Sequence, residues 1–443
     1  MSSSDLATII LLGGFILLMF LRVPIAFTML LPALGAAAVS GTNLTALVNA
    51  MLDGVSSFTL LAIPFFILMG EIMGAGRISE KIVALANLLV GRYRGGLAYV
   101  NCLDSMFFGG LSGSAIADVS SLGSVVIPMM VKQGYTPEFS VALTISTACQ
   151  GVLIPPSHNM VIYALAATGM VVSGRMINVN LEHLLMAGAL PGILLGLSLM
   201  LLCFFLRMRY KFPPGMVVPK GQRLKVALDG ILPMFTLVII MGGVAAGIFT
   251  VTESSAFGCL YTFILTYLVY RSAKLREIGK VLKNSLKTLA IVLTLIGTSK
   301  AFAFMMTDLR IPEMITNFLL SISQNKYVIL LILNVLLLLL GGLMDMAPMI
   351  VIMTPILLPV VTSPIVGMDP VHFGVVMIFN AAIGLLTPPV GTVLFVGTAI
   401  GNTTLEKVTV ATLPMLAMMV VVLLLVTYIP EISMWLPRVL FGS

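Results

Sequence analysis

The stretch GGLSGSAIAD, residues 109–118, and the stretch GVLIPPS, residues 151–157, decide the fold of this chain. Both place helix-breaking residues within sequence that is apolar enough for a lipid bilayer. A glycine between two serines favours a sharp turn, and Pro155–Pro156 cannot continue a regular helix. Because the prolines lack N–H groups, the carbonyls of Gly151 and Val152 lose their helical donors, which is costly in hydrocarbon. Two such broken elements facing each other would offer a cage of oxygen atoms to a cation.

The same pattern returns in the second half of the chain. GGLMDMAP at residues 341–348 parallels the first stretch, and GLLTPP at residues 384–389 parallels the second. The leading glycines are 42 residues apart in the first half and 43 in the second. Paired interrupted hydrophobic segments in corresponding places of two halves indicate a transporter binding site. The alternative is four kinks that only help helices to pack, but their pairing and even spacing favour the binding site.

Composition makes the chain a polytopic membrane protein. It has 443 residues, of which 59% are hydrophobic and 9% charged, whereas a soluble domain has about 25% charged residues. That length accommodates roughly ten to twelve spans of about 20 residues each. The net charge of +7 arises from basic residues in short loops, which orient the chain in the membrane, so no nucleic-acid partner is expected.

Catalytic motifs are missing from the sequence. There is no HExxH, no GxxxxGK[ST] and no GxSxG frame, and the three histidines and four cysteines lack metal-ligand spacing. We therefore expect no enzymatic activity. Without a phosphate-binding loop, uphill transport would have to draw on an ion gradient or on a partner.

The distribution of basic residues predicts an all-α fold built as an inverted-topology repeat. Each half is expected to have five crossings and one re-entrant helical hairpin, and an odd number of crossings makes the halves face opposite ways. The first repeat is residues 1–207, with a hairpin at 97–131 and a broken helix at 139–172. After a cytoplasmic loop at 208–227, the second repeat is residues 228–443, with a hairpin at 327–361 and a broken helix at 371–400. Amphipathic segments at 77–94 and 313–323 are expected to lie along the membrane surface, and the basic segment 271–287 is expected to be cytoplasmic.

Polar residues at the hairpin turns are the first candidate ligands. Asp345 lies deep in apolar sequence, where an ionised carboxylate costs at least about 2.5–3.5 kcal/mol and so usually has a partner and a function. The alternative is a helix cap, and the same alternative applies to Ser112 and Ser114. Glu71 and Asp118 are either buried in the bundle or paired at its edge.

A second group of polar residues could contact a substrate. His158 and Asn159 follow the first double proline and could donate hydrogen bonds, or they could form a satisfied interior pair. Lys300 and Arg310 are the cations nearest the outward side of the core, where an anionic substrate would need one. An ordinary pair with Asp308, or snorkelling to the interface, explains them equally well.

These motifs resemble a known family. GGLSGSA at 109–115, KQGY at 132–135 and GVLIPPS at 151–157 are similar to the large membrane subunit of tripartite ATP-independent periplasmic (TRAP) transporters, the DctM-like family. IPFF at 63–66, Gly70–Glu71, GGLMD at 341–345 and Pro388–Pro389 also fit. The similarity covers nearly the whole chain.

The resemblance implies an elevator-type, sodium-coupled importer of small organic anions, such as carboxylates or the sugar acid sialic acid, in the bacterial inner membrane. Its partners would be a small four-helix membrane subunit, here a separate polypeptide, and a soluble periplasmic substrate-binding protein. At least two sodium ions are expected. The ligands that the motifs imply are Ser112, Ser114, Gly151, Ile154, Pro156, Asp345, Gly384 and Pro389.

Two other functions remain open. A self-sufficient sodium–dicarboxylate symporter would have the same hairpin architecture but would need no binding protein. A membrane subunit that only anchors a complex would not transport at all.

Overall fold

The computed structural model describes residues 3–21, 23–172, 175–209 and 212–442. These residues are almost entirely helical, apart from a two-stranded antiparallel ribbon of β1 (Val171–Val172) and β2 (Arg175–Met176). The all-α polytopic fold is thus confirmed. Within the described ranges, seven helices are long and apolar enough to span a membrane, or nine if two bent pairs each count as one span. That is fewer than the ten to twelve spans expected, because several crossings are assembled from shorter helices.

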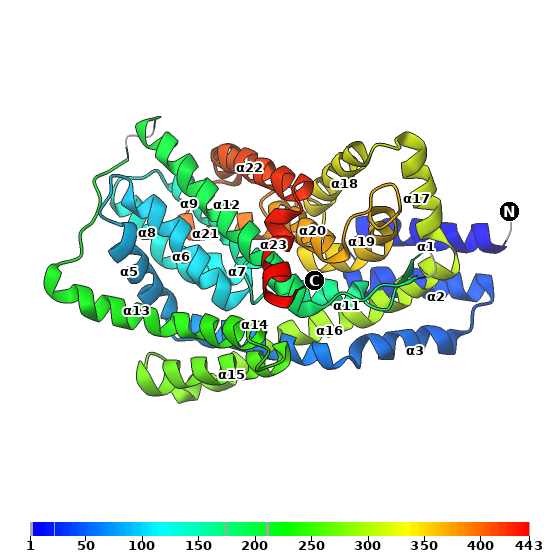
Figure 1. The fold of residues 1–443 in the computed structure, drawn as a ribbon, viewed down its shortest axis with the longest axis horizontal. Coiled ribbons are helices and arrows are strands. Elements are labelled where there is room, and N and C mark those ends of the chain that lie inside the picture. Colours follow the sequence, from blue (N-terminus) through cyan, green and yellow to red (C-terminus); the bar gives the residue numbers. More distant parts are fainter. Residues whose placement is uncertain (1–2, 22, 173–174, 210–211, 443) are drawn as a thin grey trace.

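The first half begins with four helices. The second, third and fourth pack against α16 of the second half, and Figure 1 shows the second and third beside it. The first helix packs against the second. The four are α1 (Ser3–Phe20), α2 (Ile25–Ser40), α3 (Leu44–Val55) and α4 (Ala62–Ala75), with the short 3₁₀ turn η1 (Phe58–Leu61) before α4. The sequence pattern missed α3, whose first turn is capped by Asn43, since its Oδ1 accepts a hydrogen bond from Thr45 N at 2.8 Å. The amphipathic helix α5 (Ile78–Val90) follows.

The first hairpin consists of one helix going in and a three-part helix coming out. Its parts are α6 (Gly96–Ser112), then α7 (Ala115–Asp118), the π-helical turn η2 (Val119–Gly123) and α8 (Ser124–Lys132). The broken helix is α9 (Pro137–Ala148), α10 (Gln150–Leu153) and α11 (His158–Ala167), bent by 49° at the break. Helix α11 ends at Ala167, earlier than the predicted 172, and the chain then enters the β-ribbon, with Gly169 in the left-handed region at φ +83°.

Five helices of very different length lie between the first broken helix and the second amphipathic helix. They are α12 (Leu181–Arg209), α13 (Arg223–Leu237), α14 (Gly243–Ala245), α15 (Val251–Phe263) and α16 (Ile278–Asp308), with the short turns η3 (Lys220–Gln222), η4 (Val238–Gly242), η5 (Ile264–Val269) and η6 (Leu275–Glu277) between them. The basic segment 271–287, expected to be cytoplasmic, is partly helical, because α16 starts at Ile278. Its lysines at 280, 283 and 287 therefore lie on a helix, and the first of them reaches the transport cavity described below.

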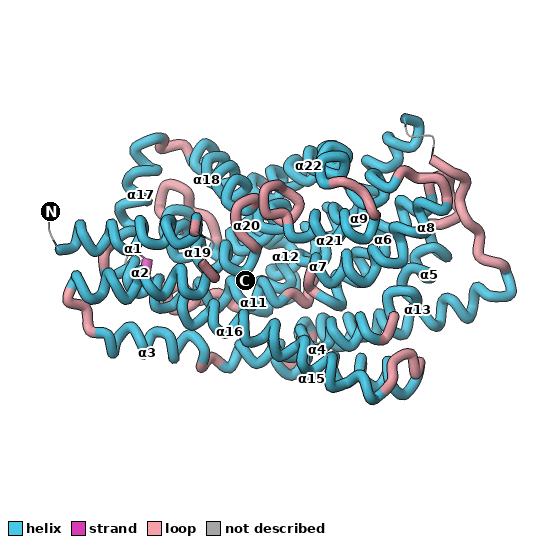
Figure 2. Tube along the Cα trace, turned by 180° about the vertical axis from the view of Figure 1, so that it is seen from behind, coloured by secondary structure: helices cyan, strands magenta, loops and turns pink. Residues whose placement is uncertain are grey.

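The second half repeats the hairpin and the broken helix (Figure 2). The amphipathic α17 (Ile311–Ile322) lies at 120° to the helix that follows it. The hairpin is α18 (Lys326–Gly341) and α19 (Met346–Val361), and the broken helix is α20 (Pro370–Gly384) and α21 (Thr392–Gly401). The chain ends with α22 (Leu405–Tyr428) and α23 (Glu431–Phe441), the second of which the sequence pattern did not predict. We call residues 96–167 and 326–401 the core, and α1–α4 with α13–α16 the scaffold.

Each hairpin crosses its broken helix at a pair of glycines. In the first half, a Cβ atom placed on Gly151 would lie 2.6 Å from Cα of Gly109. In the second half, a Cβ atom on Gly384 would lie 2.5 Å from Cα of Gly341, and one on Gly341 would lie 3.0 Å from Cα of Gly384. Without side chains the backbones meet directly, as small residues allow between membrane helices. The even spacing of these four glycines in the sequence therefore reflects two equivalent helix crossings.

We expect Gly151→Ala and Gly384→Ala to destabilise the protein by about 1–3 kcal/mol each, because each methyl group would have to push two backbones apart. The matched control is Gly279→Ala, since a Cβ atom on Gly279 meets no described atom within 4 Å. Thermal unfolding of the purified protein in detergent measures the effect. If all three variants unfolded at the wild-type temperature, direct backbone contact would not be what holds the crossings.

Candidate functional site

The first hairpin turn rests on the first helix break. Helix α6 ends where Gly113 adopts φ +62° and its N–H donates to Gly109 O at 2.8 Å. Ser114 caps α7 through a bond from Ala117 N to its Oγ at 3.4 Å, while Ser112 Oγ accepts from Ser114 N at 3.4 Å. Ser114 is thus the N-cap of α7, as the alternative proposed for it, whereas Ser112 is the last residue of α6 and makes a hydrogen bond within the turn. A hydroxyl oxygen has two lone pairs, so these hydrogen bonds leave each serine able to bind a cation as well.

The first break leaves two carbonyls without helical donors. Ile154 N donates to Gln150 O at 2.9 Å, which closes α10, and the prolines that follow have no N–H to give. Among the backbone bonds of the described residues, none reaches the carbonyls of Gly151 or Val152. The turn sits against this break, since a Cβ atom on Gly113 would lie 3.1 Å from Cα of Ser157.

The second turn has the same arrangement with a carboxylate added. Asp345 is half-buried and caps α19, because its Oδ1 accepts from Met346 N at 2.9 Å. Thr392 Oγ1, at the start of α21, lies 3.5 Å from the same oxygen. The turn is fixed to the break by Val390 N, which donates to Gly342 O at 3.0 Å.

One expectation for the second break needs correction. By analogy with Gly151 and Val152, the second double proline predicts that the carbonyls of Gly384 and Leu385 lose their helical donors, but Gly384 O accepts from Thr387 N at 3.0 Å. The reason is that Thr387 precedes the two prolines and still has an N–H to donate. Gly384 O keeps a second lone pair, and Pro389 lies exposed in the turn between α20 and α21.

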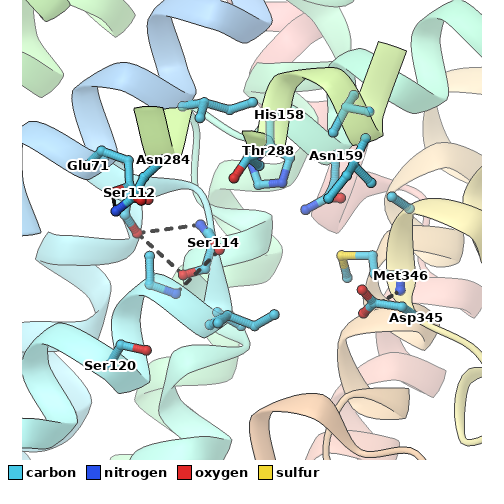
Figure 3. A pocket seen from close by; sticks show the side chains of 18 of the residues that line it. Glu71, Ser112, Ser114, Ser120, His158, Asn159, Asn284, Thr288, Asp345 and Met346 are labelled. Carbon is cyan, nitrogen blue, oxygen red and sulfur yellow. Dashed lines mark hydrogen bonds between the residues drawn. The ribbon is translucent and has the colours of Figure 1, made fainter. Parts of the chain in front are cut away.

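Both hairpin turns face one cavity of about 1260 Å³ between the core and the scaffold (Figure 3). Figure 3 shows Ser112 and Ser114 on one side and Asp345 on the other, with His158 and Asn159 between them. Outside the core, the polar or charged side chains of the lining come from α4, from α16 and from the turn η6 that precedes α16. They are Glu71, Glu277, Lys280, Asn284, Thr288 and Thr294.

The cavity extends to the end of α16 that the basic residues assign to the cytoplasm. Its lining includes Glu277 and Lys280, directly after a run of basic residues that marks a cytoplasmic loop. At the other end of α16, Asp308 Oδ2 accepts from Thr42 Oγ1 at 2.8 Å and ties α16 to the end of α2. The cavity therefore extends to the cytoplasmic end of α16, whereas the other end of this helix is bonded to α2.

Sequence reasoning missed the part of α16 that lines the cavity. Lys280, Asn284 and Thr288 are spaced four residues apart, so they lie on one face of the helix. This four-residue spacing of polar residues is the sequence pattern that could have predicted a polar helix face here. Asn284 Nδ2 lies 3.4 Å from Glu71 Oε2, so Glu71 is a partly buried cavity residue with an amide partner.

The four substrate candidates separate into two pairs. His158 and Asn159 line the cavity at the start of α11. Lys300 does not, because its Nζ donates to Thr168 O at 3.4 Å and its stem packs over Gly54. Arg310 is exposed at the start of α17, and the ion pairs of the described residues do not include one between it and Asp308.

A buried polar network supports the first crossing. Asp118 is fully buried, and its Oδ1 accepts from Ser105 Oγ at 3.4 Å. Ser105 Oγ also donates to Thr147 Oγ1 at 3.2 Å, and Thr147 Oγ1 donates to Asn101 Oδ1 at 3.1 Å. A Cβ atom on Gly151 would lie 3.5 Å from Asp118 Oδ2, so this carboxylate stands beside the first break. The sequence left Asp118 undecided, and the structure places it inside the bundle.

The second crossing has a corresponding network. Asn380 Nδ2 donates to Asn334 Oδ1 at 2.7 Å, and Asn334 Nδ2 donates to Thr427 Oγ1 at 3.2 Å. All three side chains are buried. Asn380 precedes Gly384 by four residues, as Thr147 precedes Gly151, so the polar support repeats with the glycines.

Residues 12–432 match the family described as tripartite ATP-independent periplasmic transporter, DctM component. The chain belongs to this family. It is 40% identical over 438 residues to the uncharacterized protein YgiK of Salmonella typhimurium, with 98% of each chain covered. It is also 35% identical over 433 residues to the sialic acid TRAP transporter large permease protein SiaM of Vibrio cholerae, which covers 97% of this chain and 98% of that protein.

A solved structure shares the fold. The YdaH transporter of Alcanivorax borkumensis superposes with a TM-score of 0.58 over 89% of this chain and 90% of its own, at 13% sequence identity. That likeness concerns the fold alone. Family membership makes the chain a TRAP large permease subunit for organic acid transport, a multi-pass inner-membrane protein and not an enzyme.

Proposed function

We propose that this permease couples sodium entry to the import of a small organic anion. The observation that carries the proposal is that two hairpin turns, each resting on its own helix break, face a single cavity with polar side chains between them. A cation needs oxygen ligands, but the backbone carbonyls of an intact helix already accept helical hydrogen bonds. Broken helices have carbonyls without such bonds at membrane depth, and these can bind the cation. A periplasmic binding protein would deliver the anion, and a separate small four-helix membrane subunit would complete the complex.

The proposed sodium ligands form two groups. The first combines the hydroxyls of Ser112 and Ser114 with the backbone oxygens of Gly151, Ile154 and Pro156. The second combines Asp345 with the backbone of Gly384 and Pro389. Support comes from the contact of each turn with its break, together with the free carbonyl of Gly151.

Charge balance distinguishes the two groups. Asp345 at the second turn offsets the charge of an ion directly, since its Oδ1 is bonded only to one backbone N–H and a distant hydroxyl. Beside the first group, the carboxylate of Asp118 lies behind Gly151 and is fully buried. A buried carboxylate near a bound cation offsets part of its charge even without touching it.

The anion would bind at the start of α11. A helix N-terminus offers backbone N–H groups and a positive dipole end to an anion. His158 and Asn159 line the cavity there, and no backbone acceptor within the described ranges takes their N–H groups. Three relatives are named for sialic acid, C4-dicarboxylates and 2,3-diketo-L-gulonate, all of which are organic acids. Their names support an organic acid as the substrate and do not favour one acid over another.

Movement of the core against the scaffold would expose the site to each side in turn. The contact of Lys300 on α16 with Thr168, the residue directly after α11, joins the scaffold to the end of the first core segment near the outer side. An elevator-type displacement would have to break it.

A crosslink at this contact tests the elevator. We expect the Thr168→Cys/Lys300→Cys variant, joined by a short bifunctional thiol reagent, to lose uptake and to regain it on reduction. Each single variant, treated with the same reagent, is the control. Full uptake after complete crosslinking would show that core and scaffold do not separate here.

Substitution of Asp345 tests sodium coupling. Asp345→Asn keeps the size and the cap on Met346 but removes the charge, so the protein should fold while sodium-driven uptake falls at least about tenfold. Ser112→Ala should weaken uptake less, because it removes one neutral ligand. Uptake of sialic acid, succinate and 2,3-diketo-L-gulonate into proteoliposomes, with the small subunit and binding protein present, provides the measurement.

The matched control is Glu406→Gln, which neutralises an exposed carboxylate on α22 far from the cavity. Wild-type uptake and unchanged sodium dependence in Asp345→Asn would show that this carboxylate is not part of the ion site.

Omitting the binding protein distinguishes an importer that depends on a binding protein from a self-sufficient symporter. Sodium-driven uptake that persists without it would favour the self-sufficient symporter.

A further inference from the structure

A second, smaller cavity lies away from the transport site, on the cytoplasmic side. It has a volume of about 160 Å³ and lies between the end of α5 and the loop that leads into α13. Two guanidinium groups and several apolar side chains line it. The lining residues are Asn87, Leu88, Arg92, Met216, Val217, Val218 and Arg223.

Backbone hydrogen bonds hold the walls of this cavity together. Met216 N donates to Gly91 O at 2.9 Å, and Gly95 N donates to Pro213 O at 2.9 Å. Arg94 Nε adds a bond to Phe212 O at 3.1 Å. The loop 212–218 is thus fastened along the turn between α5 and α6, and the cavity is a built feature and not a gap beside a loose segment.

The two arginines lining the cavity have no acidic partner among the described residues. The acidic side chains nearest in sequence form ion pairs with other residues, since Asp229 pairs with Lys81 at 3.0 Å and Glu80 pairs with Arg77 at 3.9 Å. Arg92 Nη2 donates to Tyr93 OH at 2.9 Å, and Arg223 Nε donates to Val218 O at 3.1 Å. A guanidinium has about five N–H donors, so most of those on each arginine remain available to an anion.

Exposed apolar side chains lie in and beside the wall of the cavity. Val217 in its wall is 65% exposed, and Leu224 and Leu228 on α13 are 73% and 56% exposed. Helix α5 is amphipathic, and the run of basic residues around this loop marks the cytoplasmic membrane surface. An inorganic anion would gain nothing from these apolar side chains, whereas the acyl chains of a lipid would cover them.

We propose that this cavity binds the phosphate headgroup of an anionic phospholipid of the inner leaflet. The two guanidinium groups would bind the phosphate through charge-assisted hydrogen bonds, and the acyl chains would run along the exposed leucines of α13. Bound lipid would link α5 to α13 beside the Lys81–Asp229 ion pair, and so would join the end of the scaffold to the segment that leads into the first hairpin.

Native mass spectrometry of the purified full chain, titrated with phosphatidylglycerol or with phosphatidylcholine, tests the proposal. We expect the wild type to retain phosphatidylglycerol preferentially, and Arg92→Gln/Arg223→Gln to bind it at least about tenfold more weakly. The matched control is Lys274→Gln/Arg276→Gln, which removes the same charge from exposed residues on another cytoplasmic loop. Thermal unfolding of each variant without lipid shows whether a loss of lipid binding comes from misfolding.

The outcomes decide between three explanations. Loss of phosphatidylglycerol in the cavity variant alone supports the site. An equal loss in both double variants, or no preference over phosphatidylcholine in the wild type, overturns it in favour of general attraction to basic loops. Displacement of the lipid by millimolar inorganic phosphate would overturn the lipid assignment and make the cavity a site for a free anion.

Discussion

Direct contact between backbones at two pairs of glycines is the constraint on which the transport site depends. Each pair joins the entering arm of a hairpin to a broken helix, and neither crossing has room for a methyl group. Because the crossing lies next to the hairpin turn, it brings the turn onto the break. In the first half the unsatisfied oxygens of the break then face the turn residues of the hairpin. In the second half Gly384 O accepts from Thr387 N, and the turn adds the carboxylate of Asp345.

The crossings also explain the buried polar networks. Close approach brings side chains on facing helices within hydrogen-bond distance, and in a low-dielectric interior such bonds hold only if their partners are fixed. Asn101 with Thr147, and Asn334 with Asn380, provide this fixation in the two halves. The glycines allow the approach, and the amides and hydroxyls set its register.

Much of this arrangement could be predicted from the sequence, for a physical reason. Glycine and proline interrupt helices in ways that few alternatives can satisfy within a bilayer, so their positions carry strong information. The hairpins, the breaks and the positions of Ser112 and Asp345 at the turns followed from it. These positions did not predict that α16 lines the cavity, because the sequence alone does not show whether Lys280 lies in a loop or on a helix. The contact between Lys300 and Thr168 could not be predicted from the sequence either, because it depends on how the core packs against the scaffold. The hydrogen bond from Thr387 to Gly384 depends on a single turn of backbone that residue types alone do not fix.

A high-resolution structure of the protein in sodium, compared with one in potassium, tests the central claim most directly. The account predicts density for an ion between Ser112, Ser114 and the carbonyl of Gly151, and for a second ion beside Asp345, in sodium alone. Density at neither place in sodium, or equal density in both salts, would contradict the claim that the glycine crossings assemble sodium sites.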